Sequence, residues 1–177
     1  MARWIIDPDH SSAAFSVRHM MIASVRGLFS RLGGSIVFDP LDKYNSSIEL
    51  SIDVSSIFTG IQNRDDHLKS ADFFDIDTYP TITFTSVRIH SIDGNKAMVT
   101  GDLTIHGITR EAVVSVEFSG PEKDPFGDGL SMGFTASAVI NREDFGLMWN
   151  QPMANNGIMV GREVQLFIDL EADLVTE

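Results

Sequence analysis

The chain has 177 residues, of which 43% are hydrophobic, and its 25 acidic residues against 13 basic ones give a formal net charge of −12. This length can bury one substantial core, and no composition shift or low-complexity stretch divides it, so we expect a single domain over residues 1–177. Nucleic acid and anionic membrane surfaces are excluded as favourable partners, because both are recognised through a basic face.

The sequence contains no cysteine, which excludes disulfide bonds and thiolate chemistry. Its first residues, Met1 to Pro8, pass directly into strand-like sequence, without the apolar segment and cleavage site of a secretory signal. No uninterrupted apolar run is long enough to cross a bilayer as a helix. We therefore expect a cytoplasmic protein with no integral membrane segment.

Apolar and polar residues alternate along the first part of the chain, the pattern of strands with one dry and one wet face. Phe15 and Val17 share a face, residues 25–29 repeat the pattern, and residues 36–38 follow. The clearest run is residues 47–54, where every second residue is aliphatic. These segments predict the first strands.

The spacing becomes helical between Asn63 and Phe74. Asn63 is placed to cap a helix, Leu68 faces inward, and Phe73 and Phe74 close the segment. We expect one or two short helices here. Pro80 then precedes the next strand, at a position where its missing N–H is tolerated.

Alternation resumes after Pro80 and continues to the end of the chain. The later strand-like runs are residues 81–85, 99–105, 114–118, 132–140 and 164–172, and the predicted turns are Asp39-Pro40, Asp93-Gly94-Asn95, His106-Gly107 and residues 120–129. Eight or nine short strands without crossover helices indicate an all-β sandwich or barrel. In a barrel, the apolar faces line a lumen that is either packed solid or holds one small ligand, and periodicity does not separate these cases.

Residue types that carry catalysis do not form a recognisable constellation. The five histidines, His10, His19, His67, His90 and His106, stand in no ligand spacing, so we predict no metal. There is no Gly-x-Ser-x-Gly elbow and no Gly-rich phosphate loop between a strand and a helix. The sequence therefore predicts neither an enzyme nor a cofactor.

The densest polar cluster is Arg64-Asp65-Asp66-His67, beside aromatic residues. Arg64 and His67 are suited to meet a polar headgroup at a barrel mouth, since guanidinium pairs well with phosphate. The alternative, which the chemistry alone favours, is a solvated helix whose Arg64 pairs with a neighbouring carboxylate.

Aromatic and methionine residues suggest one shared apolar space, although methionine also fills ordinary core gaps. The residues concerned are Phe15, Met20, Met21 and Phe29 near the first predicted turn, and Trp149 and Met153 far downstream.

Several motifs, in this order and spacing, resemble the YceI-like polyisoprenoid-binding family over nearly the whole chain. They are residues 4–11, 15–20, 25–29, 64–75, 79–84, 101–109 and 140–150, of which Arg64 to Asp75 is the most specific.

The resemblance implies an extended lipocalin-like barrel of eight antiparallel strands with a helical segment beside its mouth, often dimeric. It also implies binding of a polyisoprenoid, quinone, fatty acid or fatty amide in the lumen. The alternatives are a solid-cored structural protein linked to stress and an enzyme that modifies a lipid, with His67 or His19 as base. The ligand-binding candidates are Phe15, Met20, Phe29, Ile48, Leu50, Ile52, Arg64, His67, Phe73, Phe74, Phe84, Leu103, Val116, Phe134, Trp149 and Leu166.

Overall fold

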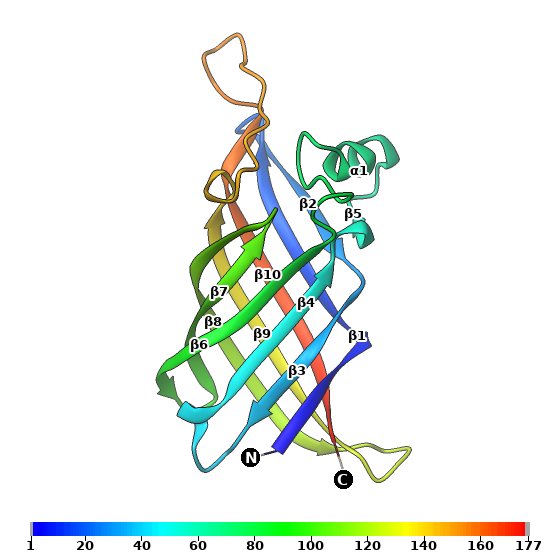
Figure 1. Cartoon of the computed structure of the whole chain (residues 1–177), viewed down its shortest axis with the longest axis vertical. Coiled ribbons are helices and arrows are strands. Elements are labelled where there is room, and N and C mark those ends of the chain that lie inside the picture. The colour runs from blue at the N-terminus through cyan, green and yellow to red at the C-terminus, as the bar shows by residue number, and fades with distance from the viewer. Residues whose placement is uncertain (1, 176–177) are drawn as a thin grey trace.

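The computed structural model describes residues 2–175 and shows a long, closed antiparallel β-barrel with one α-helix beside one end (Figure 1). Eight strands close the barrel in the order β10-β9-β8-β7-β6-β4-β3-β1, and β10 pairs with β1. The all-β barrel predicted from the sequence is confirmed. The element bounds are β1 (Ala2–His19), β2 (Ala23–Phe29), β3 (Leu32–Phe38), β4 (Ser47–Asp53), β5 (Ile57–Phe58), α1 (Gln62–Lys69), β6 (Thr81–Asp93), β7 (Lys96–Ile105), β8 (Ile108–Lys123), β9 (Leu130–Asn141) and β10 (Val160–Leu174).

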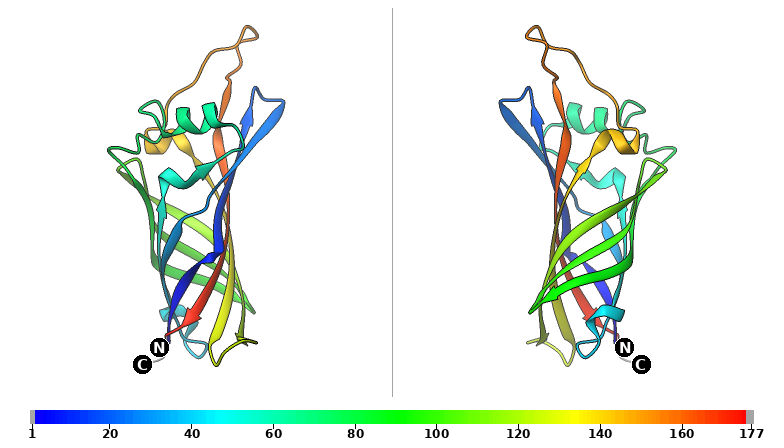
Figure 2. Two further views of the ribbon diagram at one scale, coloured as in Figure 1. Left: turned by 90° about the vertical axis from the view of Figure 1, so that its right-hand side faces the viewer. Right: turned by 90° about the vertical axis from the view of Figure 1, so that its left-hand side faces the viewer.

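The long first strand has two different neighbours. Near its start β1 pairs with β3, and from Ala13 to His19 it pairs instead with β2, while β10 runs along its other edge. A register shift against β10 between Asp7 and Ser12 marks a bulge, which increases the local bend and twist of a strand. The upper wall next to β1 is consequently built by β2 and its short partner β5 (Figure 2).

Two of the predicted turns are tight hairpins. Gly94 has φ of +60° between β6 and β7, and His106 and Gly107 have φ of +53° and +71° between β7 and β8. Prediction of a turn over the whole of residues 120–129 was wrong, because β8 continues to Lys123 through a bulge and only residues 124–129 form the loop. Alternation stops there since the strand has left the core and both of its faces are exposed.

The helical segment contains a single α-helix, α1. The prediction that Asn63 caps it was wrong, because Asn63 lies inside the first turn. Ile61 stands at the N-cap position, and no side chain caps the helix there. The buried carboxylate of Asp65 accepts hydrogen bonds from the backbone N–H of Thr59, at 2.9 Å, and from its hydroxyl, which ties the helix to the segment before it. No helix in the described part of the chain is long and apolar enough to span a membrane.

The lower end of the barrel, where both ends of the chain lie in Figure 1, is closed by packed side chains. Trp4 and Ile6 of β1 are buried, and Ile6 pairs with the fully buried Ala172 of β10. These three residues line neither of the lumen cavities described below. Only a small cavity of about 30 Å³, lined by Ile36, Phe38 and Val99 among others, lies toward this end, and the larger cavities lie toward the other end.

Candidate ligand-binding lumen

The two main cavities of the lumen within residues 2–175 are an upper one of about 250 Å³ near α1 and a lower one of about 100 Å³. They lie along one path because they share part of their walls. The shared side chains are Phe15, Phe29, Ile82, Ile105 and Leu166. An eight-stranded barrel has room for a single small or narrow ligand, and this space has that form.

The lower cavity is entirely apolar, since every residue on its wall is aliphatic or aromatic. Ten of the sequence-predicted candidates lie on this wall: Phe15, Phe29, Ile48, Leu50, Ile52, Phe84, Leu103, Val116, Phe134 and Leu166. A wall without a hydrogen-bonding side chain suits a hydrocarbon chain and disfavours a polar group, which would lose its bonds to water there.

The upper cavity differs in charge. Its wall includes Arg18, Arg64 and Arg142 together with His19 and His67, and no Asp or Glu side chain of residues 2–175 is part of it. In a chain of net charge −12 this is a local basic region. The predicted candidates on this wall are Phe15, Phe29, Arg64, His67, Phe73, Phe74, Trp149 and Leu166.

Three rings pack together on the wall of the upper cavity. The His67 ring stands edge-on to Phe73 and Trp149, with ring centroids 5.1 Å and 4.8 Å apart, and the Phe73 and Trp149 centroids are separated by 5.3 Å. His67 also hydrogen-bonds through Nε2 to a carboxylate oxygen of Asp72, at 2.8 Å. This cluster joins α1 to the loop before β10 and shields the cavity on that side.

Aromatic contacts continue from α1 into the barrel. Phe74 contacts Phe29 edge-on, with centroids 5.9 Å apart, and Phe29 lies 5.8 Å from Phe15. Phe15 and Phe29 belong to the walls of both cavities. An apolar ligand that enters beside α1 therefore meets aromatic surface until it reaches the lower cavity.

Arg64 is held by Thr59 rather than by a carboxylate. Its Nε and Nη2 groups donate to the hydroxyl and the carbonyl oxygen of Thr59, each at 2.7 Å. Within residues 2–175 it forms no ion pair, so the expected partnership with a neighbouring carboxylate was wrong. The neighbouring Asp65 is already occupied by Thr59. Arg64 thus brings a positive charge to the cavity wall, and the hydroxyl of Thr59 bridges it to the carboxylate of Asp65.

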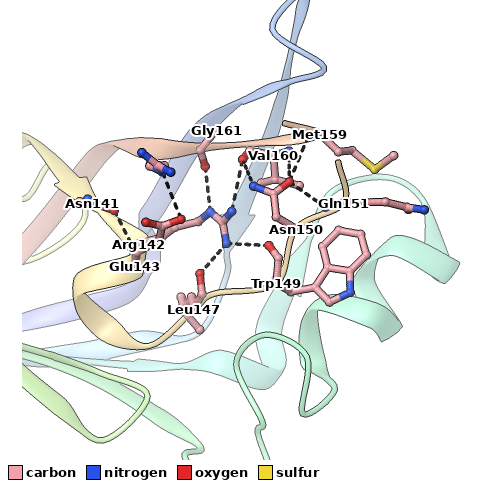
Figure 3. A network of polar contacts seen from close by, with 11 residues as sticks. Asn141, Arg142, Glu143, Leu147, Trp149, Asn150, Gln151, Met159, Val160 and Gly161 are labelled. Carbon is pink, nitrogen blue, oxygen red and sulfur yellow. Dashed lines mark hydrogen bonds and ion pairs between the residues drawn. The ribbon is translucent and has the colours of Figure 1, made fainter. Parts of the chain in front are cut away.

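Arg142 is a residue that sequence reasoning missed. It follows β9 in a short 3-10 helix, is only 4% exposed, and donates hydrogen bonds to four carbonyl oxygens, those of Leu147, Trp149, Val160 and Gly161 (Figure 3). Burial lowers the pKa of its guanidinium. These bonds fasten the loop that carries Trp149 to the start of β10. An arginine after an alternating run resembles any surface arginine, so no local signal predicts this role.

One candidate, Met20, is not on either cavity wall. It lies in the turn between β1 and β2, and its N–H donates to the carbonyl oxygen of Met159 at 2.7 Å. Other wall residues were absent from the prediction although their pattern was visible. Ile82 and Ile105 belong to the same alternating faces as Phe84 and Leu103.

Outside the lumen, the bulge in β1 brings Asp7 and His10 beside Glu171 of β10, with ligand-type atoms within 4.8 Å of one another. The sequence did not predict this cluster, because Glu171 is distant along the chain. His10 Nδ1 and Asp7 Oδ2 are hydrogen-bonded at 2.5 Å. This bond raises the pKa of His10 and lowers that of Asp7. The two side chains lie outside the lumen and form an ion pair when His10 is protonated.

Comparisons with known proteins agree with this architecture. The model of a family described as "YceI-like domain" matches residues 4–172. Two UPF0312 proteins of Staphylococcus aureus, SAS2572 and SA2479, are 36% and 38% identical to the chain over 165 residues, which is 93% of this chain and 94% of each relative.

Solved structures show the same fold. BcnA of Burkholderia cenocepacia superposes with a TM-score of 0.82 at 28% identity, over 94% of this chain and 98% of BcnA. A YceI protein of Campylobacter jejuni reaches 0.74 at 30% identity, over 90% of both chains. A polyisoprenoid binding domain from Saccharophagus degradans reaches 0.68 over 97% of this chain and 98% of its own, and at 16% identity it shows the fold alone.

Proposed function

This chain belongs to the YceI-like family, and we propose that its barrel binds one long-chain amphiphile, a polyisoprenoid or a quinone, fatty acid or fatty amide, and sequesters or carries it. The observation that carries the proposal is the lower cavity, whose wall is made only of aliphatic and aromatic side chains. The similar fold of a domain described as polyisoprenoid binding is consistent with it.

Burial of the chain accounts for useful affinity without a charged clamp. About ten methylenes at about 0.8 kcal/mol each contribute roughly 8 kcal/mol, which approaches micromolar binding before costs. Ordering a flexible chain reduces that figure. Affinity should therefore rise with chain length until the apolar path is full.

The headgroup lies in the upper cavity in this proposal. Arg64 and Arg142 bring positive charge to a wall that lacks Asp and Glu among the described residues, while the lower wall has no polar side chain. Charge-assisted hydrogen bonds from guanidinium favour a carboxylate or phosphate. The amphiphile thus enters with its chain toward Phe134 and its head toward Arg64.

Native mass spectrometry of the purified full-length chain, followed by organic extraction, tests the proposal. We expect an adduct that dissociates on extraction and is recovered with its mass unchanged, as binding without catalysis requires. Preparations free of lipid that also fail to bind added geranylgeraniol or palmitic acid would show that the proposal is wrong. Recovery of a chemically altered lipid would instead support the enzyme alternative.

Two further expectations remain predictions: that the chain forms a homodimer and that it resides in the cytoplasm. Light scattering of the purified protein measures the first, and fractionation of the source cells measures the second.

A further inference from the structure

Two segments project beyond the barrel at the end where α1 lies (Figures 1 and 2). They are the turn of residues 20–22 and the loop of residues 148–159, which together we call the apolar rim. The hydrogen bond from Met20 to Met159 joins them. Trp149 and Met159 of the rim also line the upper cavity, so the rim adjoins the space that the ligand occupies.

The rim differs from the rest of the chain in composition. Neither segment contains Asp, Glu, Lys, Arg or His, although the chain has a net charge of −12. Met21, Ile22 and Met148 are 54%, 77% and 59% exposed. Five of the eight methionines lie here, namely Met20, Met21, Met148, Met153 and Met159. The loop also contains the polar residues Asn150, Gln151, Asn155 and Asn156. Exposed apolar side chains on two joined segments mark a candidate interaction site, and methionine is common on surfaces that adapt to varied partners.

The turn residues are not those that folding alone would favour. The N–H of Ile22 donates to His19 at 3.2 Å, and Met20 and Met21 between them have φ of +51° and +59°. A β-turn whose two central residues both have positive φ favours Asn-Gly, because a side chain is strained in that conformation. Two methionines in this turn therefore point to a role other than forming the hairpin.

We propose that the apolar rim docks on a lipid bilayer with neutral headgroups, inserting Met21, Ile22 and Met148 at its surface. The two rim segments carry no ionisable side chain of their own. The guanidinium of Arg18, whose Nη2 donates to the carbonyl oxygen of Met21 at 3.0 Å, lies beside them and reaches the headgroup level on its long stem. The acidic remainder of the chain is repelled by anionic lipids. Docking brings the upper cavity against the bilayer, so an apolar chain passes between them without crossing water. This proposal rests on the proposed function, because it concerns exchange of the same ligand.

Flotation of the full-length chain with phosphatidylcholine vesicles tests the docking. We expect the wild type to float and the double variant Met21→Gly, Ile22→Thr to bind vesicles roughly tenfold more weakly, since interfacial binding scales with buried apolar area. Glycine accepts φ of +59° without strain, so the melting temperature should not fall. Neither residue lines a cavity.

A matched control removes exposed apolar groups from the barrel wall. Val87 on β6 and Val113 on β8 are exposed, and the double variant Val87→Thr, Val113→Thr should float like the wild type.

Replacing part of the phosphatidylcholine by phosphatidylglycerol should weaken flotation at low ionic strength, and added salt should restore it.

Uptake of cis-parinaric acid from solution, followed by its fluorescence, separates this proposal from the proposed function. A wild type that takes up the fatty acid but does not float, or a rim variant that floats equally well, overturns the docking and leaves lumen binding intact. A wild type that floats through the rim but takes up no fatty acid supports the docking and overturns lumen binding. The docking is also overturned if the wild type is a dimer that does not float and the rim variant is a monomer. In that case the rim is the interface with a second copy of the chain.

Discussion

The ring of Phe15 lies directly over Gly27, its cross-strand partner on β2. A Cβ atom at position 27 would stand 2.5 Å from Cζ of Phe15, far closer than packed carbon atoms approach. Because Phe15 lines both cavities, the missing side chain at Gly27 sets the width of the lumen where the two cavities meet.

Gly27→Ala should therefore push Phe15 into the ligand path. We expect affinity for a long-chain fatty acid to fall roughly tenfold, because about two buried methylenes lose their space. Gly33→Ala on β3 is the control, since its new methyl group meets nothing within 4 Å. Titration with cis-parinaric acid measures both variants, and equal affinities would contradict this role for Gly27.

Ala136→Leu should shorten the lower cavity, because Ala136 lies on its wall. Displacing about two methylenes, at about 0.8 kcal/mol each, lowers affinity for the longest chains by a little over tenfold. Short chains that occupy only the upper cavity should bind unchanged. Val139→Leu, on the exposed face of the same strand, is the matched control. A uniform loss for all chain lengths would show that the variant disturbs the fold instead.

Trp149 should report binding through its fluorescence. It lies on the upper wall, while Trp4, the other tryptophan, is buried and lines neither cavity. An apolar ligand excludes water from the Trp149 indole, so we expect a blue shift of emission on titration with palmitic acid. Trp149→Phe should abolish that shift, and its persistence would place the ligand elsewhere.

Arg142→Met should destabilise the protein. It removes this donor from the carbonyl oxygens of Leu147, Trp149 and Gly161, while that of Val160 keeps the bond from Asn150 Nδ2 at 2.8 Å. We expect a loss of about 3 kcal/mol, equivalent to a fall in melting temperature of about 6–12 °C. Arg162→Met removes an exposed ion pair with Glu143 and should cost at most about 1 kcal/mol. Thermal unfolding compares the two, and similar losses would show that the carbonyl contacts of Arg142 are not special.

The ion pair of Asp7 and His10 should make stability depend on pH. Because folding raises the pKa of His10, the pair contributes stability that is fully present below the ordinary histidine pKa of 6.5 and is lost as the pH rises through the pKa of His10 in the folded protein. Because folding lowers the pKa of Asp7, the pair contributes stability that is present above the ordinary aspartate pKa of 3.8 and is lost as the pH falls through the pKa of Asp7 in the folded protein. His10→Gln should therefore lower the free energy of unfolding most at about pH 5, and least above pH ~8. Urea unfolding at both values measures this, and an effect that grows toward alkaline pH would contradict the ion pair.

The alternating pattern was sufficient to predict which side chains share a face. Ile48, Leu50 and Ile52 lie on the inner side of β4 because side chains of a strand point alternately to its two faces. Turn residues such as His106-Gly107 likewise depend on local backbone conformation, which the sequence encodes directly. The strand pattern and the barrel's inner face thus follow from short-range chemistry.

Contacts between distant parts of the chain decided the remainder. The approach of Glu171 to His10, the carbonyl partners of Arg142 and the displacement of Met20 from the cavity to the rim all depend on how β1 and β10 close the barrel. The volume of the lumen cavities also depends on contacts between distant parts of the chain. Periodicity determines which faces are apolar, but the volume that they enclose depends on strand number, on the bend of β1 and on the size of facing side chains such as Phe15 and Gly27.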